Sequence, residues 1–414
     1  MFKISQEELH ELALVGVKIG ANVQKGQPLV IQGPVEAYEL IRECTKVAYE
    51  VGASSVYVEY HDGIRSRLSF ENESEEDLCE VPEWAIKKYE YSIKKDACFL
   101  HIVGEDPDQL AGIDPKLLQK VSLSRMNATN KFQYYTMNNI GQWSIIAYPE
   151  VHWAKKIFPD KSDDEAMEAL WQAIKKTSRI EVGKSEENWI KHNEEVKVHA
   201  RKLNEFNFKA LYFKNSLGTD LRVELIKDHF WEGGCDYSRG KYKTEFNPNI
   251  PTEEVFTMPN RYHIDGKVYS TKPLSYNGNI IPSFSLTFKD GKVVEYDAEI
   301  NKSVLENIIN TDEGSKSLGE VALISHDSPI SNTNILFYDT LFDENASCHL
   351  ALGACYPTNV KNGDNLSKEE LFELGGNDSM NHVDFMFGSS DMSIMGETYD
   401  GQMIEVFKDG NFVF

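Results

Sequence analysis

The sequence predicts an α/β fold in its first half and an α+β fold, mainly antiparallel β-sheet, in its second half. Short apolar runs alternate with helical patterns up to residue 205, which is typical of parallel strands joined by helices. Beyond residue 206, Asp-Gly pairs recur between β-rich runs and indicate hairpins. The 414 residues suit two domains, and we expect an N-terminal α/β domain at 1–205 and a C-terminal β-rich domain at 206–414.

The first half starts with a helix after Ser5, which can form a capping box with Glu8 ahead of apolar residues at helical spacing. A strand at 28–31, a helix at 35–51 and a strand at 55–60 then form a βαβ unit, which predicts parallel neighbouring strands. The elements that follow are a helix at 84–93, strands at 97–103 and 143–148, and helices at 166–176 and 186–204.

The second half starts with strands at 208–213 and 221–226, which flank a predicted hairpin turn at 216–219. Asp-Gly is a strong hairpin signal because both residues tolerate the positive φ of tight turns. The sequence therefore predicts further hairpins at Asp265-Gly266, Asp290-Gly291, Asp400-Gly401 and Asp409-Gly410.

The composition excludes several partners. A net charge of −23 repels phosphate groups, so neither nucleic acid nor a membrane is expected as a partner. The six cysteines include no Cys-x-x-Cys pair and no disulfide framework. The N-terminus has no basic segment followed by an apolar core, as a signal peptide would have. We therefore expect a soluble, cytoplasmic protein.

Three common catalytic motifs are missing. The first predicted strand leads into Gln32-Gly33-Pro34 and not into G-x-G-x-x-G, so no dinucleotide site is expected in the α/β half. A G-x-S-x-G motif for a serine hydrolase is also missing. Cys348 adjoins His349, but neighbours in sequence do not form a nucleophile–base pair with proper geometry, so a thiol nucleophile is not expected.

His382 and Asp384 form the first candidate metal half-site. In a strand, residues two apart share a face, so this imidazole and this carboxylate would point together. Val383 and Phe385 would then supply the apolar face of the same strand. The alternative is the exposed polar face of an edge strand.

His349 and Tyr356 form the second candidate. They are seven residues apart, so a helix would place both on one face, two turns apart. Glu344 precedes His349 by five residues, and a turn or helix start could bring it to the same ion. The alternative is a hydrogen-bonded core histidine and a core tyrosine.

Two carboxylate segments could complete such a site. Glu253 and Glu254 precede a short apolar run, and Glu320 lies at the start of the apolar segment 318–324. A glutamate at a strand end can be a metal ligand or only a charge at the edge of the sheet. These residues by themselves leave both possibilities open.

Taken in order, these segments resemble the M29 family of metalloaminopeptidases, the group of aminopeptidases T and S. The resemblance covers the whole chain and rests on the ordered set 249–256, 318–320, 343–351, Tyr356 and 382–386. It implies a homodimeric metallo-aminopeptidase that hydrolyses the N-terminal bond of peptides with a free N-terminus. The metals would lie in the β-rich second half.

The resemblance also implies a site with two divalent metal ions, which could be zinc, cobalt or magnesium. Glu254 is taken as the family position in preference to Glu253, and Glu320 would bridge the ions. Tyr356 would stabilise the tetrahedral oxyanion, so that Glu320 and Tyr356 are the expected catalytic residues. The expected metal ligands are Glu254, Glu320, Glu344, His349, His382 and Asp384.

Three other functions compete with this interpretation. A metal-independent glycoside hydrolase could use Glu254 and Glu320 as its two carboxylates, but it leaves His382 and Asp384 unexplained. A non-catalytic scaffold with a decayed metal site conflicts with the presence of every candidate ligand. A nucleotide-dependent enzyme would need the phosphate loop that the α/β half lacks.

Overall fold

The computed structural model describes residues 2–276 and 279–414 and divides into two compact units. Unit 1 comprises 1–191 and 235–251, and unit 2 comprises 192–234 and 252–414. The expected domain boundary at 205/206 stays a prediction. Among the described residues, no helix is both long and apolar enough to cross a membrane.

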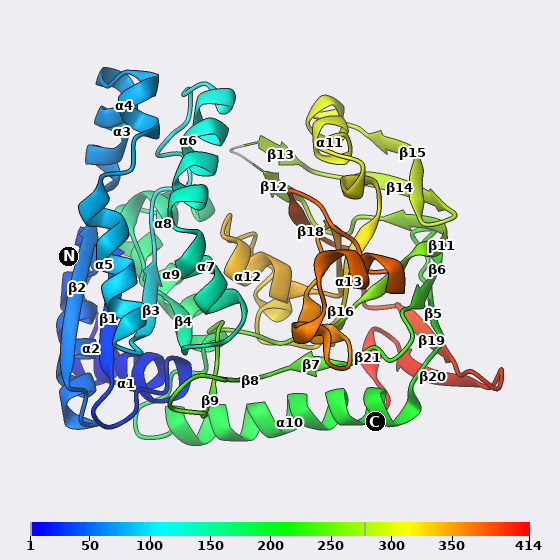
Figure 1. The fold of residues 1–414 in the computed structure, drawn as a ribbon, viewed down its shortest axis with the longest axis horizontal. Helices are drawn as coiled ribbons and strands as arrows, with labels where there is room; N and C mark the ends of the chain where they lie inside the picture. The colour runs from blue at the N-terminus through cyan, green and yellow to red at the C-terminus, as the bar shows by residue number, and fades with distance from the viewer. Residues whose placement is uncertain (1, 277–278) are drawn as a thin grey trace. The chain divides into compact units, whose positions relative to one another are not determined.

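The described part of unit 1 contains a four-stranded parallel sheet in the order β2-β1-β3-β4 (Figure 1). The Ser5 hydroxyl accepts a hydrogen bond from the Glu8 amide at the start of α1, as the capping pattern predicts. The expected βαβ unit is confirmed, since β1 and β2 pair in parallel and α2 connects them. The strands are β1 (Pro28–Pro34), β2 (Ser55–His61), β3 (Cys98–Val103), β4 (Trp143–Ala147), β8 (Asp236–Tyr237) and β9 (Glu245–Phe246).

The helices of unit 1 supply the α component of its fold. They are α1 (Gln6–Leu14), η1 (Val15–Gly20), η2 (Val35–Ala37), α2 (Tyr38–Glu50), α3 (Gly63–Asn72), α4 (Glu75–Cys79), α5 (Glu83–Lys94), α6 (Pro115–Ala128), α7 (Asn130–Met137), α8 (Val151–Ile157) and α9 (Asp163–Thr177). Helix α10 (Ser185–Phe206) begins in unit 1 and continues into unit 2.

The described part of unit 2 contains two larger sheets, with the strand orders β18-β17-β16-β10-β7 and β15-β14-β11-β6-β5-β19-β20-β21. Its pairs are antiparallel, as the hairpin signals predict. The strands are β5 (Ala210–Lys214), β6 (Asp220–Leu225), β7 (Glu232–Gly233), β10 (Val255–Thr257), β11 (Pro259–Tyr269), β12 (Leu274–Tyr276), β13 (Asn279–Ile281), β14 (Phe284–Lys289), β15 (Lys292–Ala298), β16 (Leu318–Leu323), β17 (His349–Gly353), β18 (His382–Met386), β19 (Ser393–Glu397), β20 (Met403–Lys408) and β21 (Asn411–Phe412).

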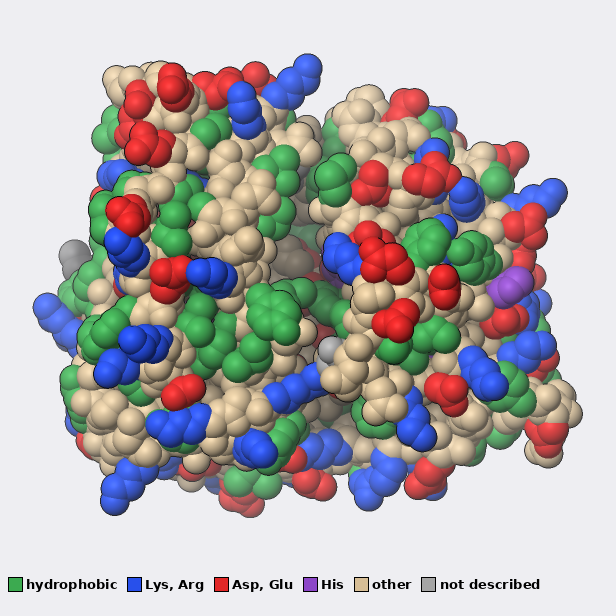
Figure 2. All heavy atoms as spheres, in the orientation of Figure 1, with side chains coloured by type: hydrophobic (Ala, Val, Ile, Leu, Met, Phe, Trp, Pro, Cys, Tyr) green, Lys and Arg blue, Asp and Glu red, His purple; other side chains and the backbone are tan. Residues whose placement is uncertain are grey.

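Short helices connect these strands. They are α11 (Lys302–Ile309), η3 (Gly314–Lys316), η4 (Ser331–Thr333), α12 (Thr340–Asp343), η5 (Glu344–Ala346), η6 (Pro357–Asn359), η7 (Gly363–Asn365) and α13 (Lys368–Leu374). On the face drawn in Figure 2, Lys and Arg side chains are interspersed with Asp and Glu.

Three of the four Asp-Gly pairs connect consecutive antiparallel strands, and the prediction for Asp265-Gly266 is wrong. This pair lies inside the long strand β11. Gly266 has a φ of +119°, and a Cβ there would lie 2.2 Å from the Asp220 carbonyl oxygen. Glycine therefore permits close approach of the neighbouring strand β6, while the Asp265 carboxylate accepts the Asp290 amide.

The five-stranded sheet has one apolar face and one face with functional side chains. Val321, Leu323, Leu350, Leu352 and Phe385 belong to the main hydrophobic core of unit 2. Successive side chains in a strand point to opposite faces, so the residues that alternate with these share the other face. Burial of the apolar set thus determines which side chains lie together on the opposite face.

Candidate metal centre

Neighbouring strands of this sheet bring the predicted ligands together. Ala351, at the middle of β17, is paired with Glu320 of β16 on one side and with Asp384 of β18 on the other. His349 is two residues before Ala351, and His382 is paired with Gly353, so all these side chains share one face. Small residues at 351 and 353 leave room between the four polar side chains.

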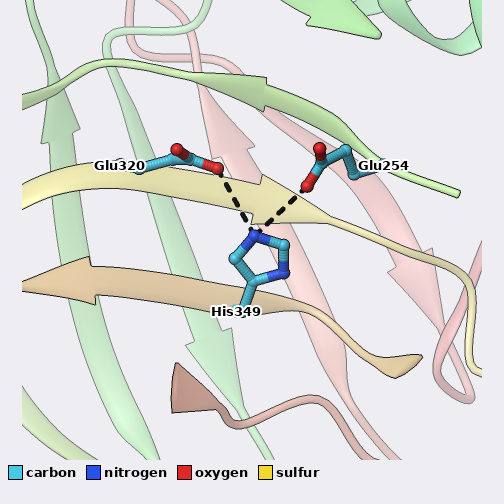
Figure 3. Close-up of side chains that lie close together, drawn as sticks. All are labelled: Glu254, Glu320 and His349. Atoms are coloured by element: carbon cyan, nitrogen blue, oxygen red, sulfur yellow. Dashed lines mark ion pairs between the residues drawn. The ribbon is translucent and has the colours of Figure 1, made fainter. Parts of the chain in front are cut away.

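Glu254, Glu320 and His349 form a first group (Figure 3). His349 Nε2 lies 3.2 Å from Glu254 Oε2 and 3.4 Å from Glu320 Oε1. Glu254 immediately precedes β10, the neighbour of β16. His349 and Glu320 are almost fully buried, with exposed fractions of 1% and 4%.

Glu320, His382 and Asp384 form a second group that shares Glu320 with the first. His382 Nε2 lies 3.4 Å from Glu320 Oε2 and 3.3 Å from Asp384 Oδ1. One oxygen of Glu320 therefore faces each histidine. The prediction that His382 and Asp384 lie in a strand is confirmed. Strand β18 is the edge strand of its sheet, as in the alternative, but the His382 and Asp384 side chains are only 23% and 13% exposed, so the polar face is not an exposed one.

Backbone carbonyls orient both imidazoles. His382 Nδ1 donates to the Ala354 carbonyl at 2.8 Å, and His349 Nδ1 donates to the Ser347 carbonyl at 3.3 Å. A carbonyl oxygen only accepts, so each Nδ1 carries a proton and each Nε2 faces the carboxylates. This arrangement is typical of metal-binding histidines, whose other nitrogen is held by a hydrogen bond.

The electrostatics are those of a buried acidic cluster with two imidazoles. Burial alone would lower the pKa of His349, but the Glu254 and Glu320 carboxylates raise it well above its ordinary value. The pKa of His382 is raised in the same way, against burial, chiefly by the charge of Asp384. Burial raises the pKa of Glu320, but hydrogen bonds with the two histidines outweigh it and bring the pKa below its ordinary value.

Glu344 and Tyr356 lie beside the two groups and belong to neither. Burial, with the charges of Asp384 and Glu254, raises the pKa of Glu344 well above its ordinary value. The Tyr356 ring lies 5.0 Å from the His382 ring and 5.9 Å from the Phe256 ring, measured between centroids. Burial raises the pKa of the Tyr356 hydroxyl, so this hydroxyl stays protonated and can donate.

The structure opposes two roles considered for this segment, a helix that carries both His349 and Tyr356 and a nucleophilic Cys348. The helix that would have joined His349 to Tyr356 is wrong, because His349 opens strand β17 and Tyr356 follows that strand. Cys348, next in sequence, belongs to the apolar core and its thiol donates to the Ile324 carbonyl. Burial raises the pKa of Cys348 to about 11, which opposes a thiolate role.

The two neighbouring glutamates have different surroundings. Glu254 contacts His349, whereas the Glu253 carboxylate lies 3.9 Å from His192 Nε2 of helix α10. Both are largely buried, so burial does not distinguish them. The two glutamates are distinguished by the histidine that each one faces.

The donor set fits divalent cations. Ligand atoms about 2.1 Å from a tetrahedral cation lie about 3.4 Å from one another. The imidazole–carboxylate distances in both groups are 3.2–3.4 Å. Carboxylate oxygens with unprotonated imidazole nitrogens suit zinc, cobalt or magnesium and include no soft thiolate.

Gly319 has a role that the sequence pattern did not reveal. The register of β16 against β17 shifts between Leu318 and Glu320. A Cβ on Gly319 would lie 2.1 Å from the Ala354 carbonyl oxygen, the same oxygen that accepts from His382. Glu320 is an expected ligand, and Gly319 before it leaves room for the Ala354 carbonyl. That carbonyl orients His382, another expected ligand.

Cation binding is expected to release about two protons near pH 7, because the raised pKa values keep His349 and His382 protonated in the metal-free protein. Cation affinity should accordingly rise with pH. Calorimetric titration with zinc in buffers of different ionisation enthalpy measures the number released. His382→Gln should lower it by about one, and binding without proton release would contradict this account.

Comparison with known proteins gives consistent matches over the whole chain. The family model described as "Thermophilic metalloprotease (M29)" matches residues 5–412. Aminopeptidase 2 of Geobacillus stearothermophilus is 43% identical, with 99% of this chain and 98% of that protein covered. Aminopeptidase AmpS of Bacillus subtilis (strain 168) is 41% identical, with 99% of each covered. The solved structure of wild-type AmpT from Thermus thermophilus superposes with a TM-score of 0.92 at 34% identity, covering 99% of this chain and 100% of that one.

Proposed function

This chain belongs to the M29 family of metallopeptidases, and we propose that it is a metallo-aminopeptidase that hydrolyses the N-terminal bond of peptides with the help of two divalent cations. The observation that carries the two-cation proposal is the placement of Glu320. Its two oxygens face two different histidines, each of which has a further carboxylate beside it. A bridging carboxylate between two such groups is the usual design of paired metal sites.

Glu254, Glu320 and His349 would hold one cation, and Glu320, His382 and Asp384 would hold the other. When bound, the two cations would supply a water of lowered pKa and would polarise the scissile carbonyl group. Zinc, cobalt and magnesium are the proposed occupants. Glu344, expected from the resemblance as a further ligand, stays a predicted one.

The remaining side chains would hold and move protons. Glu344 is a half-buried carboxylate in the wall of a cavity beside the centre and belongs to neither group, and we propose that it would take the proton of the attacking water and pass it to the leaving amine. The Tyr356 hydroxyl would donate a hydrogen bond to the oxyanion of the tetrahedral intermediate. A carboxylate of the centre would bind the α-amine of the substrate, which restricts cleavage to the first peptide bond.

The competing functions receive less support. A glycosidase would use Glu254 and Glu320 without a metal, yet His349 lies between these two carboxylates and the matched relatives are named aminopeptidases. A decayed scaffold is opposed by the complete ligand set. The homodimer and the cytoplasmic location expected from the sequence stay predictions.

Hydrolysis of aminoacyl-p-nitroanilides tests the proposal. The purified protein is assayed as isolated, after exhaustive chelation, and after addition of zinc, cobalt or magnesium, with each substrate in free and N-acetylated form. We expect activity to disappear on chelation, to return with metal at a stoichiometry near two, and to require the free amine. Activity that survives complete metal removal would contradict the mechanism, and activity on acetylated substrates would contradict the aminopeptidase specificity.

A further inference from the structure

Glu254, an expected metal ligand, lies at the very start of its strand. Strand β10 begins at Val255, and its pairing with β16 and with β7 begins at the same residue. The peptide group between Thr252 and Glu253 lies outside this ladder. A ligand at a strand end keeps a precise position only if supporting contacts fix the backbone that leads to it.

Two buried side chains of unit 2 hold this peptide group. Its carbonyl, which belongs to Thr252, accepts from His192 Nε2 at 2.7 Å, and its N–H, which belongs to Glu253, donates to Asn345 Oδ1 at 2.9 Å. Asn345 is 0% exposed. Because a peptide group is planar, bonds at its carbonyl and at its N–H fix the plane from which the chain continues to Glu254.

Asn345 also binds the turn that carries Glu344. Its Nδ2 donates to the Leu341 carbonyl at 3.2 Å and lies 3.5 Å from Glu344 Oε1. The orientation of the amide follows from these partners, since a backbone N–H requires the amide oxygen and a carbonyl requires the NH₂ group. One buried side chain therefore contacts both the segment of an expected ligand and the carboxylate proposed to carry the proton.

We propose that Asn345 is a positioning residue that fixes Glu254 and Glu344 relative to each other. This role rests on the proposed two-cation function. The oxygen of the amide would keep the first ligand group in its binding geometry, and the NH₂ group would limit the movement of the Glu344 carboxylate. Removal of such a supporting residue typically costs about 10–100-fold in metal affinity or in activity.

Two substitutions separate these two effects. Asn345→Ala removes both contacts, so the affinity for one of the two cations should fall about 10–100-fold while the other affinity changes by less than about threefold. Asn345→Asp keeps an oxygen for the Glu253 amide but places a second oxygen against the Leu341 carbonyl and the Glu344 carboxylate. It should weaken metal affinity by no more than about threefold, and it should lower kcat at saturating metal by about tenfold or more with little change in KM. A general loss of stability would not divide the two effects between the two variants.

Calorimetric titration of the metal-free protein with zinc gives the two affinities, and kinetics on leucyl-p-nitroanilide at saturating zinc give kcat and KM. Asn204→Ala is the matched control, because the Asn204 amide also forms one acceptor bond and one donor bond with the backbone, both to Trp231. Neither bond involves the segment of Glu254 or that of Glu344, so this control should lower Tm and leave both affinities unchanged. Asn345→Ser, whose hydroxyl is too short to bind both segments, replaces Asn345→Ala if that variant does not fold.

Hydrogen exchange tests the positioning role without metal and without turnover. In the metal-free protein, the segment 252–254 should exchange at least about tenfold faster in Asn345→Ala than in the wild type, and Asn204→Ala should leave it unchanged. Unchanged exchange in Asn345→Ala would overturn the positioning role whether or not the protein binds cations. Unchanged metal affinity in Asn345→Ala, or equal loss of affinity in Asn345→Ala and Asn345→Asp, would overturn it as well. A wild-type protein that binds no cation would instead overturn the proposed function, and the role of Asn345 would fall with it.

Discussion

Replacement of Glu320 by Gln is expected to lower kcat/KM by at least about 10³-fold and to reduce the bound metal below one ion per chain after dialysis. The reason is that Glu320 is the one residue shared by the two ligand groups, with one oxygen 3.4 Å from His349 Nε2 and the other 3.4 Å from His382 Nε2. An amide keeps the size of the side chain but replaces an acceptor oxygen by a donor and removes the negative charge. Elemental analysis and steady-state kinetics on leucyl-p-nitroanilide measure the two effects.

The neighbouring glutamates provide a matched pair for this experiment. Glu254→Gln should also lose metal, because Glu254 lies 3.2 Å from His349 Nε2. Glu253→Gln should retain both metal and activity within about threefold, because Glu253 faces His192 and not the centre. Loss of metal in Glu253→Gln with full retention in Glu254→Gln would show that Glu253, and not Glu254, is the ligand. Normal metal content in Glu320→Gln would contradict the shared-carboxylate geometry.

Replacement of Tyr356 by Phe is expected to lower kcat by about 10²–10³-fold, with KM and metal content changed little. The ring is held between Phe256 and His382, so loss of the hydroxyl should leave the rest of the side chain in place. A hydrogen bond that forms only with the oxyanion stabilises the transition state and not the bound substrate, and its loss therefore appears in kcat.

Tyr212→Phe is the matched control for this prediction. The Tyr212 hydroxyl donates to Glu397 within the eight-stranded sheet, so its removal should leave kcat unchanged while testing the general effect of losing a tyrosine hydroxyl. A rise in KM with unchanged kcat in Tyr356→Phe would indicate ground-state binding. Loss of metal in that variant would indicate that the tyrosine maintains the centre, and either result would contradict an oxyanion role.

Local patterns in the sequence were sufficient for the fold class and for part of the centre. The alternation of apolar runs and helical patterns predicts the parallel sheet of unit 1, which the structure contains. The two-residue period of a strand predicts that His382 and Asp384 point together, and β18 places them so. Both inferences depend on spacing within one segment, which the chain determines without reference to distant residues.

Predictions from local patterns were wrong where contacts with a distant segment determine the secondary structure of a residue. Asp265-Gly266 has the composition of a turn, but the close approach of β6 makes the glycine necessary inside a strand. The spacing of His349 and Tyr356 suits a helix, but pairing with β16 and β18 makes His349 the first residue of a strand. Tertiary packing overrides local preference in both cases.

The sequence by itself therefore determined the fold class, the strand that carries His382 and Asp384, and, through the resemblance, the family. Only the tertiary structure placed Glu254 and not Glu253 beside His349, put one oxygen of Glu320 against each histidine, and joined the segment of Glu254 to the turn of Glu344 through Asn345. The physical reason is register. Segments as far apart as residues 254 and 384 meet because interstrand hydrogen bonds and burial of one apolar face select a single alignment. A shift of one residue in the register of a strand would turn the ligands of that strand to the opposite face.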